Sequence, residues 1–266
     1  MDWLRAGFLP LLGLGALALA AHLFLALPGW ALGLPVLLVA LPVFVWLDES
    51  AHLARRAMLD AYAGRGGMLH RLLWRGWLTS LRAGVVSLVF ATLSLGALPL
   101  LAAEHWAVLA ADAVLLGLAA QWARGAARGE LTEPAAAPLT RSWLLLPNLA
   151  LIAIALAAVD YWLLTVPDLR AIPFAEAVGA AFEDGRGMAA SPAAGLVVGL
   201  FAGAEAALWW ASQTVLPGLA EGWMRTALWI VVLLGAGVAF WTVGAAFLGS
   251  LALGERVARG TTAEGA

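Results

Sequence analysis

The sequence predicts an all-α fold: a polytopic transmembrane helical bundle with six full spans plus one re-entrant or interfacial segment, or alternatively with seven spans. Hydrophobic residues make up 63% of the 266 residues and charged residues only 12%. The mean hydropathy is strongly positive, and seven long apolar stretches alternate with short arginine-bearing loops. A soluble core of this size does not need so much apolar surface. The whole chain, 1–266, is therefore expected to be a single integral membrane domain.

Each apolar stretch is expected to be a helix, because a backbone surrounded by lipid must satisfy its own hydrogen bonds. The first stretch follows Arg5 like the core of a signal peptide, but it is longer and lacks a convincing small-residue cleavage site, so we expect a retained span. Pro28-Gly29 and Glu104-His105 are expected to join two antiparallel helical hairpins as minimal turns. The stretches are approximately 7–27, 30–47, 83–103, 106–122, 143–166, 195–216 and 226–253.

The distribution of arginine predicts the orientation, since cytoplasmic loops carry an excess of basic residues. Segment 48–82 carries six arginines against three acids, and the loop after the fourth stretch carries three more, so both are expected in the cytoplasm. Segment 167–194 carries four acids against two arginines and is expected to be a periplasmic loop containing a short surface helix over 173–182. The predicted location is a bacterial inner (plasma) membrane, with multiple passes and a cytoplasmic N-terminus.

The choice between six and seven spans depends on the segment 195–216. The second, fourth and last apolar stretches all end in Ala-Arg sequences. If these three ends face the cytoplasm, the chain forms three hairpins, and 195–216 cannot cross the bilayer fully. Glu205 within the segment and Ser212-Gln213-Thr214 near its end favour this six-span version.

The cytoplasmic segment 48–82 is predicted to contain an interfacial amphipathic helix, because leucines and a tryptophan share one helical face between 69 and 81 while arginines flank it. Such a helix would bind anionic lipid headgroups. The alternative is a docking surface for a cytoplasmic partner. The residues predicted to bind lipid or a partner are Arg71, Arg75, Arg82 and Trp77.

The positions of the tryptophan, glycine and proline residues predict how the helices end, pack and bend. Most of the fourteen tryptophans fall near predicted helix ends and are expected to form interfacial belts, with Trp209, Trp210 and Trp241 as deeper exceptions. A glycine at every fourth position predicts close helix packing around 195–203. Four prolines interrupt three of the stretches and could free backbone carbonyls to line a pathway. They are Pro35, Pro42, Pro99 and Pro147.

Ionisable side chains at bilayer depth are costly, so each one is a functional candidate. The predicted ion- or proton-binding residues are Asp112, Glu205, Asp160 and His22. We expect the three acids to face a shared cavity, where they could exchange protons or coordinate a cation, with His22 or His105 as a proton relay. The alternative is that a neighbouring polar group satisfies each of them and that they only fix helix packing.

Composition and missing motifs exclude several functional classes. The chain has no cysteine and no lysine, so disulfides, thiolate metal sites and Schiff-base chemistry are excluded. HExxH, GxSxG and GxxxxGK[ST] motifs are absent. We therefore expect no enzyme, no cofactor and no metal site, and the net charge of -2 gives no sign of nucleic-acid binding.

Two functional hypotheses remain. The first is a component of ion or small-solute translocation, a transporter or channel subunit that uses the intramembrane carboxylates. The second is a non-catalytic anchor or assembly subunit of a larger membrane complex. The chain is short for a self-contained secondary transporter. We therefore expect a homo-oligomer or association with other membrane subunits.

The topology has a direct test. A reporter fused after Ala266 is expected to give a cytoplasmic signal, because six spans return the chain to the side on which it began. A periplasmic signal would exclude the six-span arrangement and support seven spans.

Overall fold

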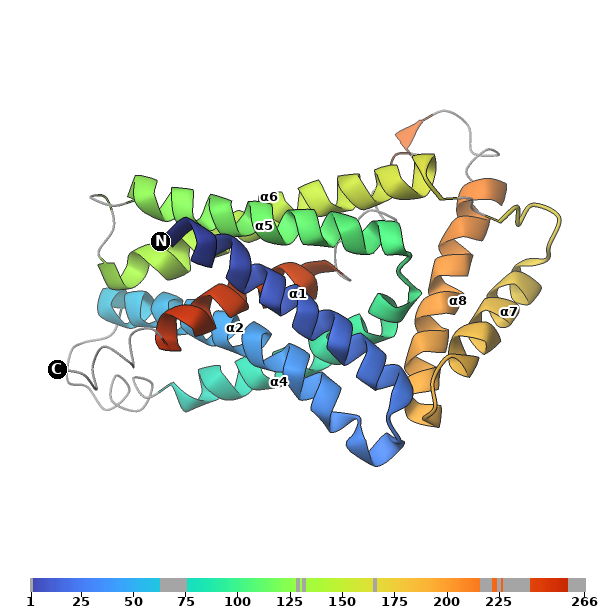
Figure 1. Cartoon of the computed structure of the whole chain (residues 1–266), viewed down its shortest axis with the longest axis horizontal. Coiled ribbons are helices and arrows are strands. Elements are labelled where there is room, and N and C mark those ends of the chain that lie inside the picture. The colour runs from blue at the N-terminus through green and yellow to red at the C-terminus, as the bar shows by residue number, and fades with distance from the viewer. Residues whose placement is uncertain are drawn as a thin grey trace.

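A computed structural model describes residues 2–62, 76–127, 130, 133–164, 167–215, 222–223, 226 and 240–257. All regular secondary structure in these ranges is helical, which confirms the predicted all-α class. Six helices are long and apolar enough to cross a membrane: five of them run lengthwise in Figure 1, and the sixth is α8. The lengthwise helices are α1 (Asp2–Ala26), α2 (Gly33–Tyr62), α4 (Trp77–Ala97), α5 (Ala103–Ala127) and α6 (Glu133–Trp162).

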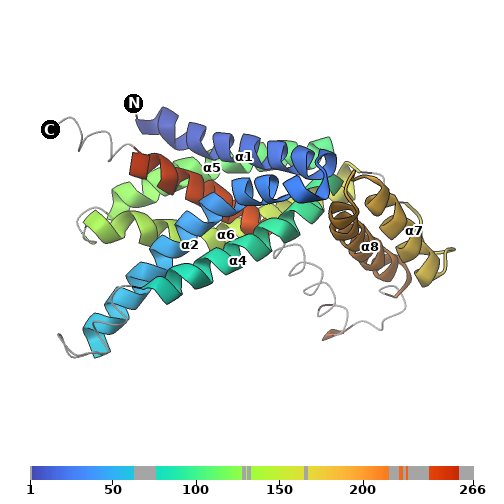
Figure 2. The same ribbon diagram turned by 90° about the horizontal axis from the view of Figure 1, so that it is seen from below.

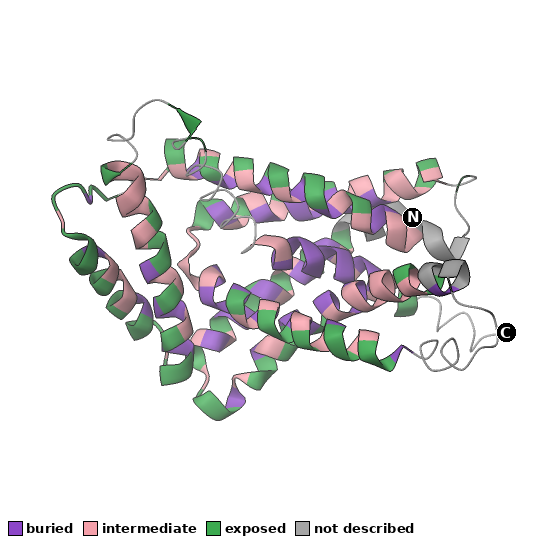
Figure 3. Cartoon of the chain, turned by 180° about the vertical axis from the view of Figure 1, so that it is seen from behind, coloured by how far each residue is buried: buried purple, intermediate pink, exposed green. Residues whose placement is uncertain are grey.

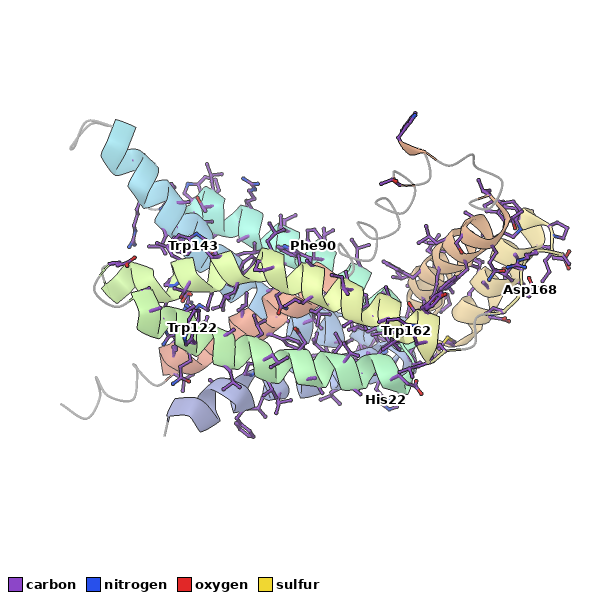
Figure 4. All side chains as sticks on the ribbon, turned by 90° about the horizontal axis from the view of Figure 1, so that it is seen from above. His22, Phe90, Trp122, Trp143, Trp162 and Asp168 are labelled. Carbon is purple, nitrogen blue, oxygen red and sulfur yellow. The ribbon has the colours of Figure 1, made fainter. Side chains whose placement is uncertain are left out.

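We name one end of the bundle after helix α8 and the other after the arginines that lie near it. The α8 end is where α1 finishes, α5 begins and α6 finishes, and α8 lies against it. At the opposite end, called the arginine end, α5 carries Arg124 and α6 carries Arg141. Exposed tryptophans lie near both ends, as Figure 4 shows for Trp122 and Trp143 at the arginine end and Trp162 at the α8 end.

The last helical segment, residues 240–257, is the most buried part of the bundle. Its side chains from Val243 to Leu248 are buried almost completely, and Figure 3 shows this segment as a purple helix among the lengthwise ones. Small residues allow the close approach: the α-carbon of Gly249 faces the Pro42 carbonyl of α2, and Gly13 of α1 faces Ser250. This segment belongs to the predicted last span, 226–253, most of whose first half lies outside the described residues.

The helices α7 (Phe174–Gly187) and α8 (Pro192–Thr214) form an antiparallel hairpin. Gly199 of α8 lies against the Phe182 carbonyl of α7, and Gly195 lies in the same way against the Arg186 carbonyl. Gly185 of α7 contributes a second small surface, which faces Gly199 and Ala202. These contacts confirm that the repeated glycines serve close helix packing. The predicted surface helix 173–182 is also present, but it extends to Gly187.

This hairpin lies across the α8 end of the bundle and not along the other helices (Figures 1 and 2). The Ala190 amide donates a hydrogen bond to the Leu25 carbonyl at the end of α1, with an N···O distance of 2.8 Å. Val197 and Phe201 pack against Gly96 of α4. The crosswise position agrees with the predicted re-entrant or interfacial segment, although α8 is long enough to span a membrane. Whether α8 crosses the membrane stays a prediction, and in the six-span version the five lengthwise helices and the segment 240–257 would be the spans.

Two of the predicted connections are wrong in detail. Segment 48–82 was predicted to hold short helices of its own, but its helical parts belong to the long helices, because α2 continues to Tyr62 and α4 already begins at Trp77. Trp77 and Arg82 therefore belong to the first turns of α4 and not to a separate amphipathic helix, whereas Arg71 and Arg75 lie outside the described residues. The predicted turn at Glu104-His105 lies inside the first turn of α5, and the chain reverses just before it, after the short 3-10 helix η2 (Leu98–Leu100). The first turn, at Pro28, leads into another 3-10 helix, η1 (Gly29–Ala31).

Two of the three tryptophans predicted as exceptions, Trp210 and Trp241, are packing residues. Trp241 packs on Phe90 and on Trp46, with ring centroids 4.6 and 5.6 Å apart. Trp46 was predicted to belong to an interfacial belt, but it is buried in this cluster. Trp210 donates a hydrogen bond to the Ile172 carbonyl at 2.9 Å and stacks edge-on with Phe174, so it holds the α7–α8 hairpin together.

The glycine contact in the hairpin can be tested with a matched pair of substitutions. A β-carbon at Gly199 would lie 2.7 Å from the Phe182 carbonyl oxygen, whereas nothing lies within 4 Å of one at Gly179. Gly199→Ala is therefore expected to lower the free energy of unfolding by about 1–3 kcal/mol. Gly179→Ala should raise it by about 0.5–1 kcal/mol, because alanine favours the helix. Thermal unfolding in detergent measures both, and equal stability of the two variants would contradict the close contact.

Candidate functional site

Three groups of polar side chains lie along the seam where α5 packs against α6. One group is at the α8 end, one is near the middle of both helices, and one is at the arginine end. We call this arrangement the polar seam. It is unusual because most of the surface between the two helices is apolar, with Leu109, Leu116 and Ile152 buried almost completely.

At the α8 end, His105 of α5 and Asp160 of α6 form a pair with an Nε2···Oδ1 distance of 2.8 Å. The Ala102 amide donates a hydrogen bond to His105 Nδ1 at 3.1 Å. Because Nδ1 is an acceptor, the ring proton of the neutral histidine lies on Nε2, which donates it to Asp160. His105 is nearly buried and Asp160 is partly exposed, so the pair connects the seam with the surface.

Glu205 of α8 completes the group at the α8 end. It lies close enough to Asp160 and His105 for their charges to act on it, and the Trp209 indole N–H donates a hydrogen bond to it. The Glu205 side chain is itself exposed. Two of the predicted candidates, Asp160 and Glu205, are therefore brought together with His105, the predicted relay, although 45 residues separate them in the sequence.

Near the middle of the seam, Asn148 of α6 donates a hydrogen bond from Nδ2 to Asp112 Oδ2 of α5 at 3.2 Å. Asp112 is 8% exposed and Asn148 is 6% exposed, so the pair is shielded from water. Asp112 lies seven residues after His105, a helical rise of roughly 10 Å. Gly244 of the last segment faces Leu145 and Asn148 on the other side, so three helices meet at this pair.

At the arginine end, Arg141 of α6 is buried, with only 1% of its side chain exposed. Its Nη2 donates to Glu49 Oε2 of α2 at 2.8 Å, and its Nη1 lies 3.3 Å from Glu255 Oε2. Arg124 of α5 also pairs with Glu255, and Arg256 donates from Nε to Glu49 Oε1 at 3.0 Å. We call these five residues the ion network. It joins α2, α5, α6 and the last segment, and its three arginines outnumber its two carboxylates.

The residues on either side of Glu49 bind other helices. Asp48 accepts a hydrogen bond from Ser80 of α4 at 2.7 Å and pairs with His52 at 3.2 Å. Ser50 lies beside Ser142 of α6, with the two hydroxyl oxygens 3.0 Å apart. The three consecutive residues 48–50 thus bind α4, α6 and the last segment, which explains why α2 stays helical beyond its apolar stretch.

The ion network was missed by sequence reasoning, which placed Glu49 and Arg141 in cytoplasmic loops. One signal could have found it. The polar residues Asp48, His52 and Arg55 follow the second apolar stretch at helical spacing, which is typical of a helix that continues and presents a polar face to a neighbour. No comparable signal in the sequence identifies Asn148 as the partner of Asp112.

The remaining candidates lie away from the polar seam. His22 is exposed on α1 at the α8 end, where Figure 4 labels it. Trp77 and Arg82 are exposed at the start of α4. Among the described residues, no group of three or more histidines and carboxylates is placed to hold a metal ion.

Comparisons of the chain with protein-family models, with curated proteins and with solved structures find no match. The class of protein is therefore defined by the fold and the seam alone: a multi-span helical membrane protein with buried charged residues.

Burial of the ion network predicts a large effect on stability. Arg141→Gln removes a buried cation from between two carboxylates and is expected to cost about 3 kcal/mol or more. Arg170 pairs with Asp168 at 3.9 Å, but both side chains are largely exposed. Arg170→Gln should therefore cost less than about 1 kcal/mol. Unfolding of both variants in the same detergent gives the comparison, and equal costs would show that the network does not hold the helices together.

Proposed function

We propose that this protein is a component of ion translocation that carries protons along the polar seam between α5 and α6. The observation that carries the proposal is the placement of ionisable groups at the α8 end, in the middle and at the arginine end of a single helix–helix interface. Polar groups that served only to fix packing would have no need to follow one line across the bilayer. Intramembrane chains of acids and histidines are a common feature of proton pathways.

Asp112 is the central group of the proposed pathway. A carboxylate at bilayer depth is expensive, and the hydrogen bond to Asp112 comes from a neutral amide rather than from a cation. A neutral partner allows the carboxyl group to accept and release a proton without breaking an ion pair. Arg141 differs in this respect, because it is held in ion pairs with two carboxylates.

The group at the α8 end would exchange protons between Asp112 and the surface. Glu205 is exposed, Asp160 is partly exposed and His105 is nearly buried, so the three side chains form a series from the surface into the seam. In the tautomer described above, His105 Nε2 carries the proton, so this hydrogen bond gives a direct route for transfer from His105 to Asp160, toward the surface.

The cargo is proposed to be a proton, because the seam offers few ligands for a metal cation. A hydrated divalent cation needs six or more oxygen ligands. The middle of the seam provides one carboxylate and one amide, and its surroundings are apolar. A proton can instead pass along a series of side chains, each of which needs to supply only one acceptor atom.

The structure represents a closed state in this proposal. His105 and Asp112 are separated by a helical rise of roughly 10 Å, which is too far for direct transfer. Leu109 lies between them on α5, and Leu156 and Ile152 occupy the corresponding part of α6. Water must enter these apolar gaps for protons to pass, as in pores that gate by wetting.

One observation favours the alternative of a non-catalytic anchor or assembly subunit. The ion network ties four helices together by ion pairs, as expected of a rigid scaffold. In that case the protein, extracted in mild detergent, would be recovered with stoichiometric partner subunits, and the polar seam would be a packing feature.

A flux measurement tests the proposed role. In proteoliposomes with a pH-sensitive dye inside, Asp112→Asn is expected to slow proton flux by at least about tenfold, a barrier increase of about 1.4 kcal/mol. Asp168→Asn, on the exposed segment before α7, should leave the flux unchanged and serves as the matched control. Flux equal to that of the unaltered protein in Asp112→Asn would remove Asp112 from the pathway. Lack of flux in the unaltered protein would favour the assembly subunit.

A further inference from the structure

Glu49 is the residue through which α2 is joined to the rest of the arginine end. Each of its two carboxylate oxygens binds a different helix: Oε2 accepts from Arg141 of α6, and Oε1 accepts from Arg256 of the last segment. Glu255 closes the ring, because it pairs with both Arg141 and Arg124. The ion network therefore surrounds the arginine end of the polar seam with contacts from four helices.

Arg141 lies directly in line with the middle of the seam. It precedes Asn148 by seven residues on α6, so the two side chains share a helix face and are separated by a rise of roughly 10 Å. Any proton that leaves Asp112 toward the arginine end must pass a buried guanidinium. A fixed cation in a narrow pathway is an electrostatic barrier to other cations and protons.

The hydrogen bonding of the network is incomplete. In the described part of the chain, Arg141 Nε and Nη1, Arg124 Nε and Gln121 Oε1 are buried without a hydrogen-bond partner. Arg141 Nη1 still forms an ion pair with Glu255 Oε2 at 3.3 Å. Buried polar groups are normally satisfied, so a cluster of unsatisfied ones requires an explanation. A second arrangement of the same side chains would provide one.

The helices that carry the network are weakened beside it. Arg141 lies between Pro138 and Pro147, both of which are inside α6. Glu49 follows Pro42 by seven residues inside α2. Proline removes a backbone hydrogen bond from a helix and is a common site of kinks. The segment 138–147 of α6 is thus bounded by two positions at which the helix can bend.

From these observations we infer that the ion network is a latch: the Arg141 side chain and segment 138–147 close the arginine end of the seam by binding Glu49 and Glu255, and open it by moving away from α2. The closing of a pathway rests on the proposed function, whereas the movement of α6 relative to α2 does not. Two measurements separate these parts.

The first measurement follows opening without any transport. The chain has no cysteine, so Thr140→Cys introduces a single thiol beside Arg141 at a buried position. Adding Glu49→Gln is expected to raise the rate of labelling by a small water-soluble thiol reagent by at least about tenfold, a change of about 1.4 kcal/mol in the free energy of opening. Glu176→Gln, at an exposed site on α7, is the matched control and should leave the labelling rate unchanged. Should Glu49→Gln fail to fold, Arg256→Gln replaces it, because it removes only the partly exposed arm of the network.

The second measurement locks the latch without removing a charge. The Ser50 and Ser142 hydroxyl oxygens lie 3.0 Å apart on α2 and α6, so Ser50→Cys with Ser142→Cys should form a disulfide on oxidation. Oxidation is expected to stop proton flux in proteoliposomes, and reduction should restore it. The control is the single variant Ser50→Cys, which cannot form this disulfide. Under oxidising conditions it should conduct protons as fast as it does under reducing conditions.

The outcomes distinguish the two proposals. Unchanged labelling in Glu49→Gln, or a measurable proton flux that is equal in the disulfide-linked and reduced proteins, would overturn the latch. Faster labelling together with no flux in any variant would establish the movement and reject proton translocation. Faster thiol labelling, together with a proton flux that stops only when the disulfide forms, would support both the latch and proton translocation.

Discussion

The buried guanidinium of Arg141 is the constraint on which the rest of the bundle depends. A charge with 1% of its side chain exposed is tolerated only when opposite charges surround it. The two carboxylates that do so come from α2 and from the last helical segment, which lie far from Arg141 in the sequence. Their positions fix how α2, α6 and the last segment meet. They also require α2 to continue as a helix beyond its apolar stretch, since Glu49 lies past the end of that stretch.

Packing around the last segment, residues 240–257, fixes how closely the other helices of the bundle approach one another. Small residues on this segment allow α1 and α2 to approach its backbone, as Gly249 does against Pro42. Close packing of this kind holds helices together in lipid, where the hydrophobic effect between helices is weak. The α7–α8 hairpin is different, because it is built on its own glycine contacts and meets the bundle only at the α8 end. The protein therefore consists of a tightly packed bundle and of the α7–α8 hairpin, which lies over one end of it.

The apolar stretches of the sequence predicted the helices well, because length and hydropathy alone decide whether a segment suits a bilayer. Asp112, Asp160 and Glu205 were also identifiable, since a lone acid in an apolar stretch stands out. The pairing of His105 with Asp160 depends on how two helices are rotated about their axes, which a single sequence does not record. Glu49 and Arg141 were misplaced because charges at the end of a hydrophobic stretch are typical of loops. Only the contact between residues 92 positions apart shows that they are buried.

The crosswise position of α8 determines where the polar seam meets its surroundings. Because the hairpin lies over this end of the bundle, Glu205 of α8 is brought close to Asp160 of α6 where the two meet. If the seam carries protons as proposed and this end lies at the level of the lipid headgroups, it would draw protons from the layer of solution next to the membrane. The ion concentrations in that layer follow the charge of the lipids within about a Debye length. Lipid composition would then change the rate at which protons enter the seam, with no change in the protein itself.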